Sequence, residues 1–137
     1  MTTTSDQTIF TLVHNDQAID DYGAAVAAAC QDLARVANGC RCAVIPAPTA
    51  WTLLSHVRVG LRHLEEVLDY LPGGLKRSLS DPTIVVTDAD DRDPVKSIDL
   101  AVDALEPALN QVGDVLTRLE AAQAAIGAQS WHPTYEF

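Results

Sequence analysis

One stretch of the chain carries two histidines and a glutamate at spacings that could hold a metal ion. His56 and His63 are seven residues apart, and Glu66 follows His63 by three. In a helix, side chains three or four residues apart lie on one face, so a His-x-x-Glu pair can bind one metal. A metal site inside a helical bundle needs carboxylates projecting inward from several helices, whereas the inward positions here are almost all apolar. We therefore expect surface histidines and no metal site.

The three cysteines offer a second kind of metal site, but their spacing does not complete one. Cys40 and Cys42 have a single residue between them, and Cys30 precedes them on a predicted helix. A structural zinc ion takes four ligands, so these thiolates would need partners from distant parts of the chain. Three free thiols are the simpler interpretation, and they favour a reducing compartment such as the cytoplasm.

The acidic run at residues 88–93 begins like a calcium-binding loop. Asp88 and Asp90 match the first two ligand positions of an EF-hand. Arg92 then stands at the third ligand position, and Asp93 stands where the loop needs glycine. We expect instead an exposed loop whose last residue, Asp93, caps the next helix, because a carboxylate is favourable at a helix N-terminus.

No spacing in the sequence matches a catalytic motif. There is no nucleophile elbow, phosphate-binding loop or dinucleotide fingerprint, and the adjacent glycines Gly73 and Gly74 follow a predicted helix rather than a strand. The predicted inward positions bring together no ionisable pair that could exchange a proton with a substrate. We predict no catalytic residues and no cofactor.

Composition and charge restrict the partners of the chain. Its 137 residues are 47% hydrophobic and carry a formal net charge of -10. Nucleic acid and anionic membranes repel such a surface, so we expect neither as a partner. The sequence has no run of about 20 apolar residues that would span a bilayer. Its polar first seven residues do not resemble a secretory signal. We therefore expect a cytoplasmic protein.

Three segments with heptad spacing must position any functional residue. Apolar residues recur at alternating steps of three and four over residues 16–38, 50–71 and 94–127, which is typical of helices packed in a bundle. The stripe of the third segment is the clearest, and it consists of Ile98, Val102, Leu105, Leu109, Val112, Leu116, Leu119, Gln123 and Ile126. We predict an all-α fold, an antiparallel three-helix bundle in one domain covering residues 1–137, with flexible ends at 1–7 and 130–137.

Prolines and glycines mark the expected helix ends. The sequence from Pro72 to Gly74 is expected to end the second helix. Asp93 and Pro94 are the expected N-cap and first residue of the third helix. Pro107 falls inside that helix, opposite its apolar stripe. We therefore predict one continuous helix that bends near Pro107, with its convex side toward solvent.

A small α/β fold is the alternative. Short β-prone runs at residues 9–13, 42–45 and 83–87 each precede a predicted helix, an order that would suit a three-stranded parallel sheet. The runs are short, and such a sheet would have a small core. Extended linkers beside a helical bundle are the preferred interpretation.

The predicted helices differ in length, and this difference bears on assembly. The third would be about 50 Å long and the other two about 33 Å. The surplus would leave apolar residues exposed, which a second subunit could cover by two-fold symmetry. We therefore predict a homodimer, or a complex with another protein. The expected interface residues are Ile98, Val102, Leu105, Leu116, Leu119 and Ile126. We also expect Arg58 to pair with Asp99 or Glu106 across two helices.

These observations support three functions of different classes. The leading hypothesis is a non-catalytic helical module for protein interaction or self-association, since the apolar stripes come without inward polar chemistry. The second is an acidic inhibitor or DNA mimic that binds a basic partner, using a partial row of carboxylates at Asp99, Asp103, Glu106 and Asp114. The third is a metal-binding helical protein that uses His56, His63 and Glu66 or the cysteines.

Overall fold

The chain is all-α, as its heptad spacing predicts. The computed structural model describes residues 3–38, 44–83, 85–87, 89–90 and 92–130, and these form three helices and no strand. The helices are α1 (Thr3–Asn38), α2 (Ala47–Ser80) and α3 (Pro94–Ile126). By its internal contacts the chain divides into Met1–Val44, which contains α1, and Ile45–Phe137, which contains α2 and α3. The arrangement of all three helices in one domain stays a prediction.

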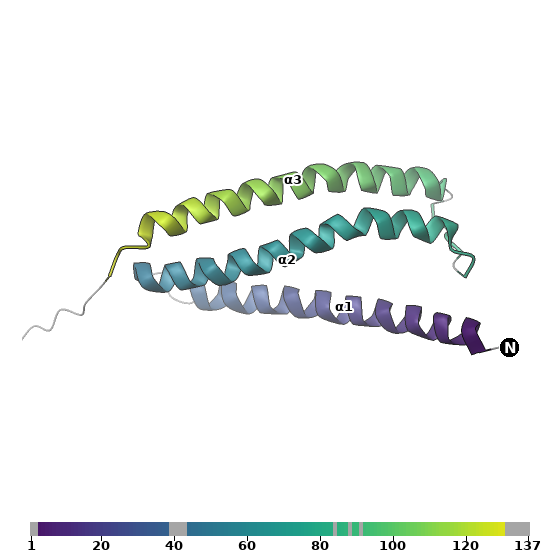
Figure 1. The fold of residues 1–137 in the computed structure, drawn as a ribbon, viewed down its shortest axis with the longest axis horizontal. Coiled ribbons are helices and arrows are strands. Elements are labelled where there is room, and N and C mark those ends of the chain that lie inside the picture. The colour runs from purple at the N-terminus through teal and green to yellow at the C-terminus, as the bar shows by residue number, and fades with distance from the viewer. Residues whose placement is uncertain (1–2, 39–43, 84, 88, 91, 131–137) are drawn as a thin grey trace, which may run out of the picture. The chain divides into compact units, whose positions relative to one another are not determined.

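Helix α1 begins well before the point that the sequence pattern indicated. It is one unbroken helix of 36 residues, drawn in purple in Figure 1. The predicted start at residue 16 is therefore wrong, as is the predicted flexible segment for residues 3–7. Residues 3–15 contain neither glycine nor proline, so no breaker interrupts the helix upstream of its heptad stripe. From residue 16 onward the large apolar side chains of this stripe are exposed.

Helix α2 continues past its predicted end at Leu71 and reaches Ser80, with Pro72 in its interior. An interior proline removes one backbone hydrogen bond and crowds the preceding turn, which costs about 3 kcal/mol. The apolar face nevertheless continues, because Leu75 and Leu79 follow Leu68 and Pro72 at heptad spacing and are half-buried. Burial of these two leucines offsets the effect of the breakers, so the helix ends only at Asp81.

Helix α3 has nearly the bounds that were predicted. Asp93 is its N-cap, and the Asp93 carboxylate accepts a hydrogen bond from the backbone N–H of Val95 at 3.1 Å. Pro94 is the first helical residue, and Pro107 lies inside the helix without ending it. Figure 1 shows α3 gently curved, with its convex side away from α2. Pro107 is exposed, so the predicted single, curved helix is confirmed.

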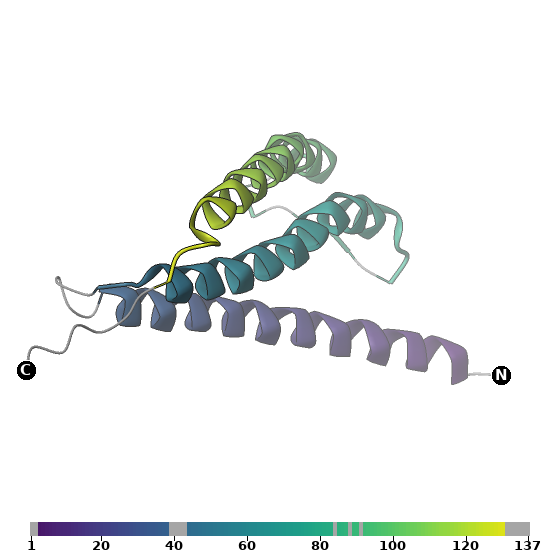
Figure 2. The same cartoon turned by 60° about the vertical axis from the view of Figure 1, so that its left-hand side comes forward.

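Helices α2 and α3 form an antiparallel hairpin joined by residues 81–93 (Figures 1 and 2). They have 34 and 33 residues, so each covers the full length of the other. With 36 residues, α1 is just as long. The surplus length of the third helix, which was the reason for predicting a dimer, is therefore absent. Within the described residues of the hairpin, only Ile98 and Gln123 are buried.

The α/β alternative is wrong for every β-prone run that the structure describes. Residues 9–13 lie inside α1. Residues 44–45 and, in the second loop, residues 83 and 85–87 contain no strand. The rest of the run at 42–45 lies outside the described residues, as does most of the predicted flexible tail, at 131–137.

The turn after α2 is organised by Asp81. The Asp81 carboxylate accepts hydrogen bonds from the Thr83 hydroxyl at 2.6 Å and from the Thr83 backbone N–H at 2.8 Å. Both bonds favour the charged carboxylate, and they lower the pKa of Asp81 below its usual value of 3.8. This turn directs the chain out of α2 and into the loop that leads to α3.

We expect Pro72→Ala to stabilise the protein. If α2 runs through position 72, the substitution restores a backbone N–H and removes the proline ring from the preceding turn. The free energy of unfolding should then rise by about 1–3 kcal/mol. Urea unfolding followed by circular dichroism measures this change. A variant no more stable than the parent would place the end of α2 at Leu71 after all.

We expect Thr83→Val to raise the pKa of Asp81 toward 3.8, because it removes the side-chain hydrogen bond to the carboxylate. A lowered pKa in the folded chain means that the charged carboxylate stabilises the turn above pH 3.8. That contribution disappears as the pH falls through the folded-state pKa. Titration of the Asp81 carboxyl carbon by NMR measures the shift, and Thr87→Val in the same loop is the control. An unchanged Asp81 pKa would show that Thr83 does not hold the carboxylate.

Candidate functional site

The predicted metal ligands do not form a site. His56, His63 and Glu66 are exposed on α2. Nδ1 of His63 lies 3.9 Å from Oε2 of Glu66, and no third histidine, cysteine or carboxylate joins this pair in the described part of the chain. Cys30 is free and exposed on α1, and the predicted pair Cys40 and Cys42 lies outside the described residues.

The acidic run at residues 88–93 contains the helix cap that the sequence predicts. Asp93 caps α3, and Arg92 pairs with Asp90 at 3.2 Å, with both side chains largely exposed. Asp88 and Asp91 lie outside the described residues. A surface ion pair of this kind contributes at most about 1 kcal/mol, so the described part of the loop connects and caps helices.

The six predicted interface residues lie on the side of α3 that packs against α2. Gln123, which bonds to α2, shares its helix face with residues three, four and seven positions away. Ile98 is buried, and the other five are half-buried: Val102, Leu105, Leu116, Leu119 and Ile126. These side chains therefore form much of the seam inside the hairpin. A surface for a partner must be sought on another side of the helix pair.

Gln123 is the centre of a polar cluster within this seam, and its exposed fraction is only 4%. Its side-chain N–H groups donate to the backbone oxygen of Trp51 at 3.1 Å and to Oγ of Ser55 at 2.7 Å. Its carbonyl oxygen accepts a hydrogen bond from Nη1 of Arg58. Nη2 of Arg58 lies 3.6 Å from a carboxylate oxygen of Glu120. We call these five residues the Gln123 cluster. Both amide protons and the amide oxygen of Gln123 are used.

The cluster belongs to a line of contacts with heptad spacing on both helices. Three residues seven apart on α2 face three residues seven apart on α3: Trp51, Arg58 and Glu65 against Gly127, Glu120 and Gly113. A Cβ atom added at Gly127 would lie 3.4 Å from Nε1 of Trp51, and one added at Gly113 would lie 3.9 Å from Oε2 of Glu65. Large α2 side chains thus lie over two glycines and beside Glu120. We call this line the polar seam.

Arg58 faces α3 as expected, but neither predicted partner is correct. It contacts Glu120 and Gln123 rather than Asp99 or Glu106. The extension of α2 to Ser80 moves the turn of the hairpin away from Arg58, and this places Arg58 opposite the C-terminal part of α3. The Arg58 side chain is 21% exposed, and its Nε atom is buried without a hydrogen bond. Such an unpaired donor costs about 1–3 kcal/mol.

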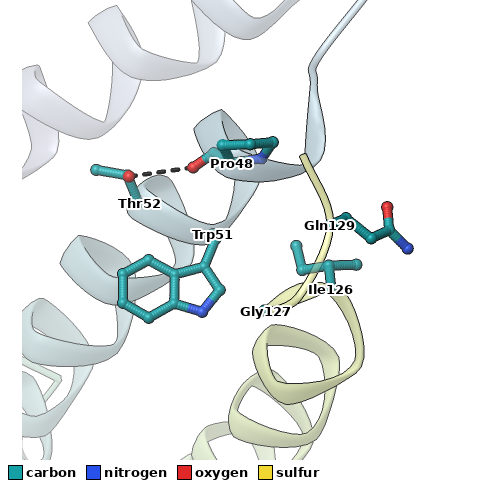
Figure 3. Close-up of a pocket in the computed structure, with 6 residues that line it drawn as sticks. All are labelled: Pro48, Trp51, Thr52, Ile126, Gly127 and Gln129. Carbon is teal, nitrogen blue, oxygen red and sulfur yellow. Dashed lines mark hydrogen bonds between the residues drawn. The ribbon is translucent and has the colours of Figure 1, made fainter. Parts of the chain in front are cut away.

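Two shallow hollows adjoin the polar seam, one at the open end of the hairpin and one near its middle. The first has a volume of about 310 Å³ and is lined by Pro48, Trp51, Thr52, Ile126, Gly127 and Gln129 (Figure 3). The Thr52 hydroxyl donates within α2 to the backbone oxygen of Pro48 at 3.1 Å. The second, about 380 Å³, has Arg62, Glu65, Glu66 and Glu120 among its lining residues. Neither combines a nucleophile with a base held in hydrogen-bond reach.

The side of the hairpin opposite the polar seam is apolar. The polar seam lies along one edge of the contact between the two helices. The residues of α2 and α3 at the other edge of this contact therefore lie together, on the opposite side of the hairpin. The positions are mainly apolar: Leu53, Val57, Gly60, Leu64, Val67 and Leu71 on α2 and Ala101, Ala104, Ala108, Val115 and Ala122 on α3, with Gln111 and Arg118 following Ala104 at heptad spacing along the edge. We call this surface the leucine flank. Leu64, Val67, Leu71 and Val115 are exposed by 37%, 51%, 41% and 45%.

The acidic residues proposed for a basic partner are exposed on α3. Asp99, Asp103, Glu106 and Asp114 lie within a broad band of helix positions that points away from the leucine flank. Their exposure is compatible with the inhibitor hypothesis, which stays a prediction. An exposed charged face is also the usual solvated side of a helix.

Comparison of the chain with protein-family models, with curated proteins and with solved structures finds no match. None of the described helices combines the length and the hydropathy that are needed to cross a bilayer.

Sequence reasoning placed Gln123 on the apolar stripe of α3 but assigned it no role. The signal was present, since a glutamine interrupts a run of leucine, valine and isoleucine at an inward position. A polar residue at such a position needs hydrogen-bond partners from the facing helix. Serine and arginine at positions 55 and 58 supply them, together with the backbone of Trp51.

We expect Gln123→Ala to destabilise the chain by about 2–3 kcal/mol, because it leaves the buried groups of Arg58 and Ser55 without their partner. Urea unfolding followed by circular dichroism measures the loss. Ser55→Ala is the milder comparison, since it removes one acceptor and should cost about 1 kcal/mol. A Gln123→Ala variant as stable as the parent would mean that the cluster contributes nothing to the hairpin.

Proposed function

We propose that the chain is a non-catalytic helical module that self-associates through the leucine flank of its α2/α3 hairpin. The observation that carries the proposal is the exposure of Leu64, Val67, Leu71 and Val115 along one side of the helix pair. Large apolar side chains in a continuous row are usually covered by another surface. The flank is mainly apolar, and its nearest ionisable residue on α3, Arg118, lies at the edge, where it can stay in water on association.

The flank is also suited to pairing with a second copy of itself. Its α2 edge is made mainly of leucine and valine, and its α3 edge mainly of alanine. Two flanks related by two-fold symmetry can place the large residues of each α2 over the small residues of the other α3. Two hairpins packed in this way would make a four-helix arrangement, a common route by which short helical chains complete a core.

Binding of a basic partner by the acidic face of α3 is the second candidate, supported by the exposed carboxylates on that helix. The two candidates differ in their dependence on salt. Association of apolar flanks should persist or strengthen at high ionic strength, whereas association through carboxylates should weaken.

We expect the chain to be dimeric at micromolar concentration and the double variant Leu64→Glu/Leu71→Glu to be monomeric. Each buried leucine contributes about 1.5–3 kcal/mol, so loss of both should weaken association by more than about 100-fold. Sedimentation equilibrium measures both states. Both leucines are exposed in the hairpin, so circular dichroism should show unchanged helicity in the variant.

The matched control is Val59→Glu, at an exposed position on α2 outside the leucine flank. It introduces the same side chain on the same helix and should leave the dimer intact. A parent chain that stays monomeric at high micromolar concentration would contradict the proposal. A dimer that Val59→Glu disrupts as strongly as the double variant would place the interface elsewhere on α2.

A further inference from the structure

The leucine stripe of α2 and the side of α2 that faces α3 do not coincide. The stripe runs through Leu54, Val57, Leu61, Leu64, Leu68 and Leu71. If this stripe were centred on α3, Leu64 and Leu71 would enter the seam. Instead both leucines are exposed. Arg58 and Glu65, which lie outside the stripe, are half-buried. Helix α2 is therefore turned about its own axis, toward the side that carries the polar seam.

The contacts that accompany this rotation are all on the polar seam. Within the described residues, Arg58 contacts the side chains of Gln123 and Glu120 on α3. Gly113 leaves room for Glu65 against α3, and Gly127 does the same for Trp51. The glycines permit the close approach, whereas the polar contacts across the seam are the hydrogen bonds of Gln123 and the ion pair of Arg58 with Glu120. A hydrogen-bonded group buried among apolar residues fixes register and orientation more strictly than leucines, which tolerate rotation.

We infer that the contact between Arg58 and Gln123 sets the rotation of α2 and thereby keeps Leu64 and Leu71 on the outside of the hairpin. The inference deepens the proposed function, because it identifies the residues that present the leucine flank to a partner. Arg58 and Gln123 are positioning residues in this account, and neither belongs to the flank itself. Without their contact, only the bonds of Gln123 to Ser55 and to the backbone of Trp51 oppose a turn of the leucine stripe toward α3.

The double variant Arg58→Met/Gln123→Leu tests the inference in the full-length chain. Both substitutions retain side-chain volume and remove the contact between Arg58 and Gln123. They also remove the bonds of Gln123 to Ser55 and to the backbone of Trp51. The readouts are two NMR contacts across the polar seam: the Trp51 ring to the Hα atoms of Gly127, and the Glu65 methylene groups to the Hα atoms of Gly113. Both are within one hairpin, so they report rotation whether or not the chain dimerises.

We expect both contacts to be lost in the double variant, while the chain stays helical by circular dichroism. The contact at Gly113 is the more decisive, since Glu65 lies two helical turns from the substituted Arg58. Glu120→Gln is the matched control, because it weakens the exposed ion pair and leaves the Arg58–Gln123 hydrogen bond in place; both contacts should remain. A double variant that keeps both contacts would overturn the inference.

Arg58→Met alone covers the case in which the double variant fails to fold. It leaves Gln123 bonded to Ser55 and to the backbone of Trp51, so the open end of the hairpin stays tied. We expect the Gly113 contact to weaken and a second set of signals to appear for Glu65. A single set of signals with the parental contact would refute the role of Arg58. The oligomeric state, measured separately, tests the proposed function without bearing on the rotation.

Discussion

The hydrogen bonds of the Gln123 side chain are the constraint on which the hairpin depends. The seam between α2 and α3 is otherwise made of half-buried apolar residues, and Ile98 is the only one of them that is buried among those described. Such a seam, rich in leucine and alanine, has many arrangements of similar energy, because apolar contacts are not directional. The Gln123 amide has two N–H donors and one oxygen acceptor, and each needs a partner at a fixed place. This requirement excludes most of the possible arrangements of the two helices. Buried polar groups have this role in coiled coils, where they specify register at a cost in stability.

The sequence predicted the existence and type of the helices much better than their ends. The start of α3 was found because its signals are local: a capping aspartate followed by proline. The start of α1 was missed because no glycine or proline precedes its heptad stripe, whereas the end of α2 was missed because the helix runs through its breakers. Pro72, Gly73 and Gly74 are breakers by local propensity, yet α3 needs a partner along its whole length, and Leu75 and Leu79 supply it. Tertiary packing outweighs a local preference of a few kcal/mol.

The same error at the end of α2 explains why the partners of Arg58 were predicted wrongly. In an antiparallel hairpin the position of the turn determines which residues face each other, so a longer α2 moves Arg58 toward the end of α3. The heptad stripe of α3 indicated its apolar face, but the six residues that were predicted to contact a partner lie toward α2. Heptad spacing identifies the apolar face of a helix and leaves open which neighbour covers it. The polar seam depends on register, and register was the part that local sequence could not supply.

The rotation of α2 connects the stability of the hairpin to its proposed interaction surface. Leu64 and Leu71 are exposed by 37% and 41%, so turning the leucine stripe fully inward would add only about 1 kcal/mol for each. The observed arrangement gives up that burial and also leaves Nε of Arg58 without a partner. Three hydrogen bonds to Gln123, worth about 1 kcal/mol each, are similar in size to this loss. The balance becomes favourable when another surface covers the two leucines, since their burial then adds to the polar contacts instead of competing with them. A partner that covers the flank would therefore favour the arrangement that keeps the Gln123 cluster.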